Sequence, residues 1–308
     1  MTVLRVLDRD VAVSSLDRVL YPATGTTKAE VIDYYVRVAN VLLPHVAGRP
    51  VTLHRFPEGV GGPHFFQTRT PPHPPWVRTA RMAYERSGKV FESPVIDDLP
   101  SLVWAGNLST VEIHPFLGLA ESQERPLVMV FDLDPGAPAG MAEACAVALR
   151  VRALLDADGL ASYAKTSGAK GVHVYVPVRD ATYDDTKPYA KRVAATLTRE
   201  TPDLVVDRMT RALRPGKVLV DWSQNDMGKS TVAPYSLRAL RVPTVSMPVP
   251  WDDVERAVAT GDTDHLFYDP ARALATVEAE GDRFAALLPL ASGRCAVPPS
   301  PQPRPSRR

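Results

Sequence analysis

The sequence has little cysteine and almost no net charge, and each shortage excludes a class of protein. Only Cys145 and Cys295 occur among 308 residues. Neither lies in a CxxC motif, which excludes a zinc ribbon and argues against a disulfide scaffold. Lys and Arg number 36 against 35 Asp and Glu, and this balance excludes a histone-like polycation. It leaves nucleic-acid binding open, because a local basic face can coexist with a local acidic site.

Long apolar runs are also missing. No segment approaches the about 18 consecutive apolar residues that read as a membrane span. The first residues, MTVLRVLDRD, lack the apolar core of a signal peptide. We therefore expect a soluble, cytoplasmic protein with no membrane partner. Proline, in contrast, is abundant at 30 residues, and the Pro- and Arg-rich tail 298–308 is expected to be disordered because it has nothing to bury.

Helix-like and strand-like segments alternate along the chain, which predicts an α/β or α+β fold. Thr27 and Glu30 have capping-box spacing at the start of the first helix, and Pro44 is expected to end it. The Gly- and Pro-rich segment 57–75 is long for a connection, which favours a functional role. The expected helices cover 24–46, 139–156, 186–199, 251–260 and 271–288, and the expected strands cover 51–56, 127–134, 172–177 and 218–222.

Two carboxylates, Asp132 and Asp134, end the apolar strand 127–134. Residues two apart on a strand project from the same side, so these side chains are expected to lie together. Their mutual repulsion and burial are costly unless a cation joins them, and such an oxygen-rich pair suits Mg²⁺ or Mn²⁺. The alternative is a solvated strand end that turns at Pro135 and Gly136.

The segment 165-KTSGAKGVH-173 leads directly into another strand. Glycines let backbone N–H groups approach an anion, Lys170 adds a positive charge, and Ser167 adds a hydroxyl. His173 stands two residues beyond Gly171, where it could donate to a phosphate oxygen. The alternative interpretation is a plain hairpin turn.

A third carboxylate, Asp221, emerges from the apolar strand 218–222. Three carboxylates on neighbouring strand ends can hold two divalent ions about 4 Å apart, the arrangement used for phosphoryl transfer. Gln224, Lys229 and Arg238 could then contact a polyphosphate. The alternative is a strand-terminal Asp that serves the turn. A P-loop is excluded, because Ser223 stands where the motif ending in 228-GKS-230 needs its first glycine.

The order of these three segments resembles that of the archaeo-eukaryotic primase superfamily. More closely, the chain resembles the polymerase domain of bacterial ATP-dependent DNA ligase D, over about residues 15–285. The matching strings are 18-RVLYPATGTTK-28, 131-FDLDPG-136, 166-TSGAKGVHVY-175, 220-VDWSQN-225 and 234-PYSLR-238. The resemblance implies a primase-like α/β core with an RRM-like central sheet and flanking helices. It also implies one catalytic domain over 1–297, in which about 1–125 contacts template and DNA ends and about 126–290 is the catalytic core.

The resemblance assigns roles to residues of this sequence. It implies that two Mn²⁺ or Mg²⁺ ions are bound by Asp132, Asp134 and Asp221. The implied nucleotide contacts are Ser167, Lys170, Gly171, His173, His114, Gln224 and Arg238. The implied DNA contacts are Arg18, Lys28, Arg55, Phe65 and Phe66.

Among the DNA contacts, the resemblance gives Phe65 and Phe66 the role of stacking on unpaired template bases, and the alternative is that both rings lie in the core. Arg18 and Lys28 match a pocket for a 5′-phosphate. The chain departs from end-joining members of the family, which carry Lys in place of Arg18. They also tend to carry a Lys-Arg pair where this chain has His54 and Arg55.

The implied activity is template-directed addition of rNTPs or dNTPs to a primer 3′-OH at short gaps or broken ends, in end joining or gap-filling repair. The implied partners are gapped DNA, a 5′-phosphate or 3′ overhang, the nucleotide, a Ku-like end-binding protein and a separate ligase. Because no lysine nucleotidylation motif is present, we expect either a stand-alone protein or an excised domain. Two other functions stay open: a metal-dependent nuclease or phosphohydrolase, and a non-catalytic module that bridges DNA ends.

Overall fold

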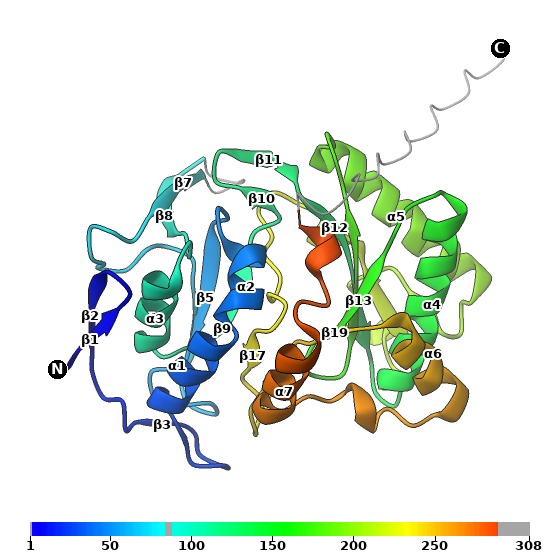
Figure 1. Ribbon diagram of the computed structural model, residues 1–308. Coiled ribbons are helices and arrows are strands. Elements are labelled where there is room, and N and C mark those ends of the chain that lie inside the picture. Colours follow the sequence, from blue (N-terminus) through cyan, green and yellow to red (C-terminus); the bar gives the residue numbers. More distant parts are fainter. Residues whose placement is uncertain (1, 84–87, 289–308) are drawn as a thin grey trace.

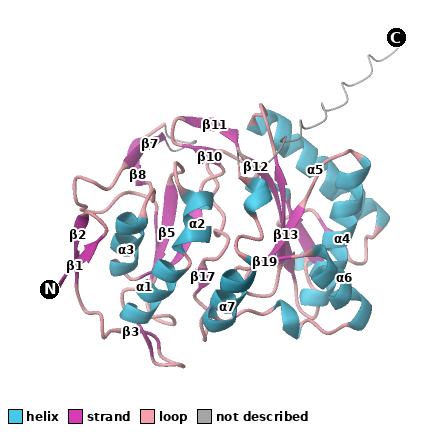
Figure 2. Cartoon of the chain, viewed as in Figure 1, coloured by secondary structure: helices cyan, strands magenta, loops and turns pink. Residues whose placement is uncertain are grey.

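The fold contains two main β-sheets that lie side by side in space, and helices pack against them (Figures 1 and 2). The computed structural model describes residues 2–83 and 88–288. Cys295 and the tail 298–308, which we expected to be disordered, lie outside the described residues. Among the described helices, none is both long and apolar enough to cross a membrane.

The larger sheet has six strands in the order β15-β16-β12-β14-β13-β19. Its members are β12 (Val128–Pro135), β13 (Tyr163–Thr166), β14 (Val172–Pro177), β15 (Val205–Val206), β16 (Val218–Asp221) and β19 (Pro248–Val249). Its outer face packs on α4 (Met141–Ala157) and α5 (Tyr183–Glu200), and α6 (Trp251–Thr260) packs on α4. Phe131 and Leu133 of β12 are buried in this core. Because strand side chains alternate, Asp132 and Asp134 face the opposite side.

The smaller sheet consists of β6 (Phe65–Gln67), β5 (Val51–Arg55) and β9 (Thr110–Pro115), all antiparallel. It packs with α1 (Lys28–Arg37), α2 (Ala39–Val46) and α3 (Leu99–Asn107). A segment much later in the sequence also pairs with this sheet. The amides of Thr231 and Ala233 donate hydrogen bonds to the β9 carbonyls of Pro115 and Ile113. Helix α7 (Pro270–Glu280) then packs on α1. Segments from the last third of the chain therefore pack on the smaller sheet and on its helix α1.

Small hairpins and short helices complete the described chain. The short strands are β1 (Thr2–Val6), β2 (Arg9–Val13), β3 (Val19–Tyr21), β4 (Thr26–Thr27), β7 (Thr79–Ala83), β8 (Val90–Pro94), β10 (Gly118–Leu119), β11 (Ser122–Pro126), β17 (Leu237–Arg238) and β18 (Thr244–Val245). The 3-10 helices are η1 (Arg211–Leu213), η2 (Trp222–Gln224), η3 (Asp264–Leu266) and η4 (Ala285–Leu287). The β1–β2 hairpin and α3 are elements that the sequence analysis did not predict.

The predicted fold class is confirmed, and each expected helix and strand has a counterpart. Two helix boundaries were wrong. The helix expected over 24–46 divides at Val38 into α1 and α2, and Pro44 lies inside α2 instead of ending it. Val38 lies six residues before Pro44, and the missing N–H of Pro44 leaves the carbonyl of Asn40, four residues earlier, without its helical hydrogen bond. The capping box of Thr27 and Glu30 is confirmed.

The helix expected over 271–288 stops early. Helix α7 ends at Glu280, and Gly281 follows with φ of +70°, a conformation that only glycine adopts at low cost. The Gly281 amide bonds to the carbonyl of Val277 at 2.9 Å and closes the last turn. The remaining apolar residues form the separate turn η4.

Candidate active site

Asp132, Asp134 and Asp221 lie together on the inner face of the larger sheet. Asp132 of β12 stands directly opposite Asp221 of β16 in the antiparallel register, and Asp134 projects from the same face two residues further along. Asp132 also stands opposite His173 of β14. Strand pairing therefore brings together the carboxylates that the sequence places almost ninety residues apart.

The three carboxylates are not equivalent. Burial, together with the negative charges of Asp221 and Asp134, raises the pKa of Asp132 to about 7. Asp134 faces two cations, with its carboxylate 3.3 Å from Lys170 Nζ and 3.5 Å from Arg214 Nη1. The cluster offers only oxygen ligands, and the repulsion among its carboxylates raises the pKa of Asp132. Both features fit a site for divalent cations that prefer carboxylate ligands.

Asp221 is oriented by the turn that follows it. Its Oδ1 accepts hydrogen bonds from the backbone amide and the hydroxyl of Ser223, at 2.9 and 2.7 Å. Its Oδ2 accepts from Gln224 Nε2 at 3.2 Å. Asp221 thus serves the turn, as the alternative interpretation held, and also stands within the carboxylate cluster. The two interpretations are compatible.

A cavity of about 480 Å³ opens over this cluster. The three carboxylates line it, together with all seven side chains or backbone positions predicted to contact nucleotide, namely Ser167, Lys170, Gly171, His173, His114, Gln224 and Arg238. Phe66 and His114 come from the smaller sheet, so the cavity lies where the two sheets face each other. The cavity is large enough for a small ligand and is lined mainly by charged and polar groups.

The turn between β13 and β14 forms one wall of the cavity. Ser167 Oγ accepts hydrogen bonds from the amides of Ala169 and Gly171, at 3.2 and 3.1 Å. Gly168 has φ of +73°, and a Cβ at Gly171 would lie only 2.4 Å from the carbonyl oxygen of Leu133. The segment is therefore a hairpin turn whose glycines allow tight packing, and it also presents Lys170 to the carboxylates.

His173 lies beside Asp132, with its Nε2 at 3.3 Å from Oδ1. Burial and the nearby charges of Lys165 and Arg238 hold the pKa of His173 well below its usual value, so the imidazole is neutral. Its Nδ1 is buried and has no hydrogen-bond partner among the described residues. Lys165, which the sequence analysis did not single out for a role, is fully buried behind it and donates to Ser246 Oγ at 2.6 Å.

Arg214 is a second site residue that the sequence analysis missed. It belongs to a basic segment, with Arg208, Arg211 and Lys217, that precedes the strand ending in Asp221, and a charge run of this kind is usually a solvated face. The structure instead brings Arg214 to the cavity wall, where it faces Asp134. Arg214 and Asp134 are far apart in the sequence, so no local pattern predicts their contact.

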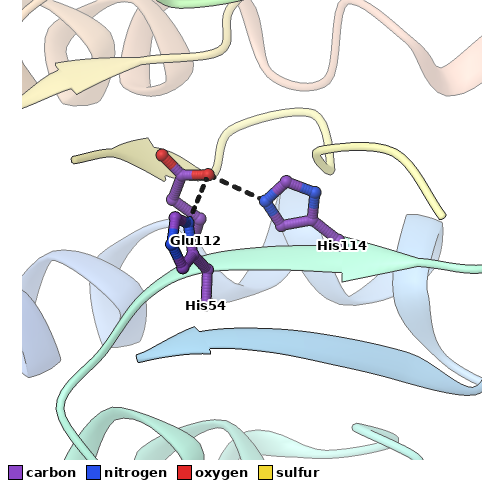
Figure 3. A group of neighbouring side chains, drawn as sticks. All are labelled: His54, Glu112 and His114. Carbon is purple, nitrogen blue, oxygen red and sulfur yellow. Dashed lines mark hydrogen bonds and ion pairs between the residues drawn. The ribbon is translucent and has the colours of Figure 1, made fainter. Parts of the chain in front are cut away.

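Glu112 of β9 lies between His54 and His114 and contacts both (Figure 3). Its Oε1 accepts from Arg238 Nε at 3.0 Å and from the Ala239 amide at 2.9 Å. Its Oε2 lies 2.8 Å from His114 Nε2 and 3.2 Å from His54 Nδ1. Arg238 in turn donates to the carbonyl of Ser167 at 2.8 Å, which ties the turn to the smaller sheet.

The protonation of this cluster is set by burial and by its own contacts. Burial opposes ionisation of Glu112, but the hydrogen bonds from His114 and His54 and the charge of Arg238 hold its pKa well below the usual value. Burial lowers the pKa of His114. One donor atom from each of His54, Glu112 and His114 lies within 4.8 Å of the others, so this group could hold a metal ion. The sequence signal was available, since 110-TVEIHP-115 places two polar residues on one face of a strand.

Phe65 and Phe66 are exposed, by 43% and 58%, so the alternative that both rings lie in the core is wrong. They belong to β6, where the sequence analysis expected a loop. Phe66 stands opposite His54 and stacks on its ring, with 3.9 Å between centroids. The Arg55 guanidinium lies 5.2 Å from the centre of the Phe65 ring. Both aromatic faces are thus held in place at the surface.

Arg18 and Lys28 are neighbours, since the Lys28 amide donates to the Arg18 carbonyl at 2.8 Å. Arg18 is exposed, and its guanidinium donates to the carbonyl of Pro57. Lys28 is buried, and its Nζ donates to the carbonyl and side-chain oxygens of Asn107, at 3.0 and 3.1 Å. Neither residue lines the cavity that holds the carboxylates.

Comparison with known proteins identifies similar sequences and a similar structure. A family model described as the LigD primase-polymerase domain matches residues 27–283. Among curated proteins, the chain is 40% identical over 281 residues to the multifunctional non-homologous end joining protein LigD of Mycolicibacterium smegmatis. It is 32% identical over 248 residues to the bifunctional non-homologous end joining protein LigD of Bacillus subtilis. These alignments cover 90% and 80% of this chain but 36% and 39% of the relatives, so the chain spans little more than a third of their length.

The structural comparison covers almost all of both chains. The polymerase domain of Mycobacterium tuberculosis ligase D, solved in complex with DNA, superposes with a TM-score of 0.82 at 39% sequence identity. The match covers 90% of this chain and 97% of that domain. The two folds therefore agree over most of both chains.

Proposed function

The chain belongs to the LigD primase-polymerase family, and from this premise we propose that it is a template-directed DNA/RNA polymerase. It adds rNTPs or dNTPs to the 3′-OH of a primer at short gaps or broken DNA ends, in end joining or gap-filling repair. The observation that carries the proposal is a single cavity in which three carboxylates face the Ser-Gly-Lys turn and Arg238. A triphosphate needs both features, whereas the carboxylates alone would serve a nuclease equally well.

Asp132, Asp134 and Asp221 are the proposed ligands of two divalent ions, Mn²⁺ or Mg²⁺. Ions bound there would lower the pKa of the attacking hydroxyl and stabilise the charge of the departing pyrophosphate. The positions of these ligands are set by the sheet, since strand pairing fixes Asp132 opposite Asp221. Lys170 and Arg214 neutralise Asp134, and we propose that both move toward phosphate oxygens when nucleotide binds.

The proposed triphosphate contacts are Ser167, Lys170 and Gly171 of the turn, together with Arg238. The position of Arg238 is fixed from both sides, by Glu112 and by the Ser167 carbonyl. The remaining proposed nucleotide contacts are His173, His114 and Gln224. His173 is neutral, so it can donate one hydrogen bond to a phosphate oxygen without adding charge.

The proposed DNA contacts lie outside the carboxylate cluster. Phe65 and Phe66 present exposed rings on which unpaired template bases can stack, each worth about 1–3 kcal/mol. Arg55, held against Phe65, and the neighbouring Arg18 and Lys28 supply positive charge, the last two for a 5′-phosphate. Further proposed partners are a Ku-like end-binding protein and a separate DNA ligase.

A gap-filling assay tests the proposal. The protein is incubated with a duplex that carries a short gap and a 5′-phosphate, with Mn²⁺ and either rNTPs or dNTPs. We expect templated extension of the primer, and we expect Asp132→Asn to reduce it at least about a hundredfold, because metal charge stabilisation is worth several kcal/mol. A matched duplex without the 5′-phosphate tests the Arg18 and Lys28 contacts.

Two outcomes would remove the proposal. One is the absence of extension by the wild-type protein with any nucleotide. The other is release of mononucleotides from the primer without added nucleotide, which would favour the nuclease alternative. An Asp156→Asn variant serves as a control, since this exposed carboxylate of α4 pairs with Arg152 on the outer side of the larger sheet.

A further inference from the structure

His54, Glu112 and His114 form a second group of side chains that could hold a metal ion (Figure 3). None of them belongs to the carboxylate cluster. His54 stands opposite Glu112 in the β5–β9 register, and His114 follows Glu112 by two residues, so all three project from one face of the smaller sheet. The Glu112 Oε2 lies 3.2 Å from His54 Nδ1 and 2.8 Å from His114 Nε2. Ligands around a tetrahedral ion with bonds of about 2.0–2.1 Å stand roughly 3.3 Å apart.

We propose that His54, Glu112 and His114 form a Zn²⁺ site, with the fourth coordination position open toward the cavity. Two imidazole nitrogens and one carboxylate oxygen are the donor set of many zinc centres that keep one position for water. Mg²⁺ and Ca²⁺ prefer all-oxygen sites, so they are expected to go to the aspartates instead. The inference does not rest on the proposed function, because metal binding is measured without nucleotide or DNA.

The ring nitrogens of His54 and His114 that face Glu112 Oε2 both share that oxygen in hydrogen bonds. An ion at this position would replace these hydrogen bonds with metal bonds from the same three atoms.

Groups around the cluster are placed as partners of metal ligands usually are. His54 Nε2, on the side away from Glu112, lies 2.9 Å from His64 Nδ1. Such a bond on the second ring nitrogen fixes the tautomer and orientation of a ligating histidine. On the other side, Glu112 uses Oε1 alone for Arg238 and the Ala239 amide, so Oε2 remains for the ion.

The open position is inferred from the cavity. His114 lines it, whereas Glu112 and His54 lie behind its wall and are buried. An ion held by these three atoms would therefore have protein on one side and the cavity on the other. The fourth ligand is expected to be a water molecule in the free protein.

The test separates the two clusters by mutation. Untagged protein carrying Asp132→Asn, Asp134→Asn and Asp221→Asn is titrated calorimetrically with Zn²⁺, so that the carboxylate cluster no longer competes. We expect one Zn²⁺ per chain, and we expect its loss when His54→Gln or His114→Gln is added. His64→Gln should weaken binding by about 10–100-fold, as is usual for a residue that supports a ligand. His265→Gln, in η3, is the matched control and should leave binding unchanged.

A second measurement decides the matter without the histidine variants, in case they fail to fold. Imidazole nitrogen NMR shifts of the triple-Asn protein, with and without Zn²⁺, should move at His54 Nδ1 and His114 Nε2. Absence of Zn²⁺ binding, shifts confined to other histidines, or equal binding by His54→Gln and His114→Gln proteins that circular dichroism shows to be folded would each overturn the proposal. The cluster would then be a hydrogen-bonded support for Arg238 and nothing more.

Discussion

Asp132 is the residue on which the chemistry of the cavity depends most. It is paired with Asp221 on one side and with His173 on the other, and Asp134 follows on the same face. A cluster of like charges destabilises the folded protein unless a cation neutralises it. The carboxylates therefore make metal binding and the protonation of Asp132 competing events.

The first prediction concerns pH. The pKa of Asp132 is raised from 3.8 to about 7, so the folded protein holds a proton there that the unfolded chain releases. The metal-free fold consequently loses stability as pH rises from 3.8 to about 7. At pH values below about 7, Mn²⁺ must displace the proton of Asp132 in order to bind. We expect Mn²⁺ affinity, measured by titration calorimetry, to rise up to about tenfold per pH unit and to level off above pH 7.

The control for the pH dependence is Asp132→Asn, which has no proton to displace at this position. Its residual Mn²⁺ affinity should be weaker and should vary much less between pH 5.5 and 7. A wild-type affinity that is already constant over this range would contradict the raised pKa.

The second prediction concerns the exposed ring of Phe66. Phe66→Ala removes an aromatic face on which a base can stack, and the expected loss is about 1–3 kcal/mol, or roughly 5–150-fold in affinity for a gapped duplex. The measurement is fluorescence anisotropy at fixed salt. Phe267→Ala is the matched control, because that ring is also exposed, at 41%, but lies in the turn between η3 and α7. Equal effects of both variants would show that Phe66 has no special role.

At the scale of elements, the sequence predicted β5, β12, β14 and β16 but not β6, β9 or β13, and it did not predict how the strands pair. The apolar run 127–134 with two terminal aspartates was enough to place Asp132 and Asp134 on one face. No local pattern could show that β16 pairs with β12 in the register that sets Asp221 against Asp132, because that register depends on the packing of distant segments. The resemblance to a family supplied this link.

The residues missed by sequence reasoning share a physical cause. Glu112, Lys165 and Arg214 owe their positions to contacts between elements far apart in the chain, to Arg238, Ser246 and Asp134. Lys, Arg and Glu side chains are usually exposed to solvent, so residue type alone predicts that these three lie on the surface. Only the alternation in 110-TVEIHP-115 carried a local signal, and it did not reveal the partners of Glu112.

The third prediction concerns the packing of the β13–β14 turn on β12. Gly171→Ala places a methyl group 2.4 Å from the backbone carbonyl oxygen of Leu133, and backbone cannot yield as a side chain can. The expected cost is about 1–3 kcal/mol of unfolding free energy, measured by chemical denaturation. Gly140→Ala is the control, since the nearest atom to its new methyl group is a carboxylate oxygen of Glu143 at 3.8 Å. Its cost should be the smaller one, about 0.5–1 kcal/mol, because alanine is a poorer N-cap residue than glycine. Equal costs would mean that the turn is not held as closely as described.

At the scale of the molecule, the cavity exists because two sheets of different size face each other. The larger sheet supplies the carboxylates and the glycine turn, and the smaller sheet supplies His114 and the exposed aromatic strand β6. Residues 231–233 pair with β9, and Arg238 a few residues later contacts Glu112 of the smaller sheet and the Ser167 carbonyl beside the larger sheet. Metal, nucleotide and template contacts are thereby proposed for adjacent parts of one surface.

The most direct test of this account is the position of Mn²⁺ relative to a bound nucleotide. Crystals grown with Mn²⁺ and a non-hydrolysable NTP analogue are measured at the manganese absorption edge. The account predicts anomalous peaks coordinated by Asp132, Asp134 and Asp221, with the triphosphate against the turn 167–171. Manganese bound away from these three carboxylates, or a triphosphate bound away from that turn, would contradict it.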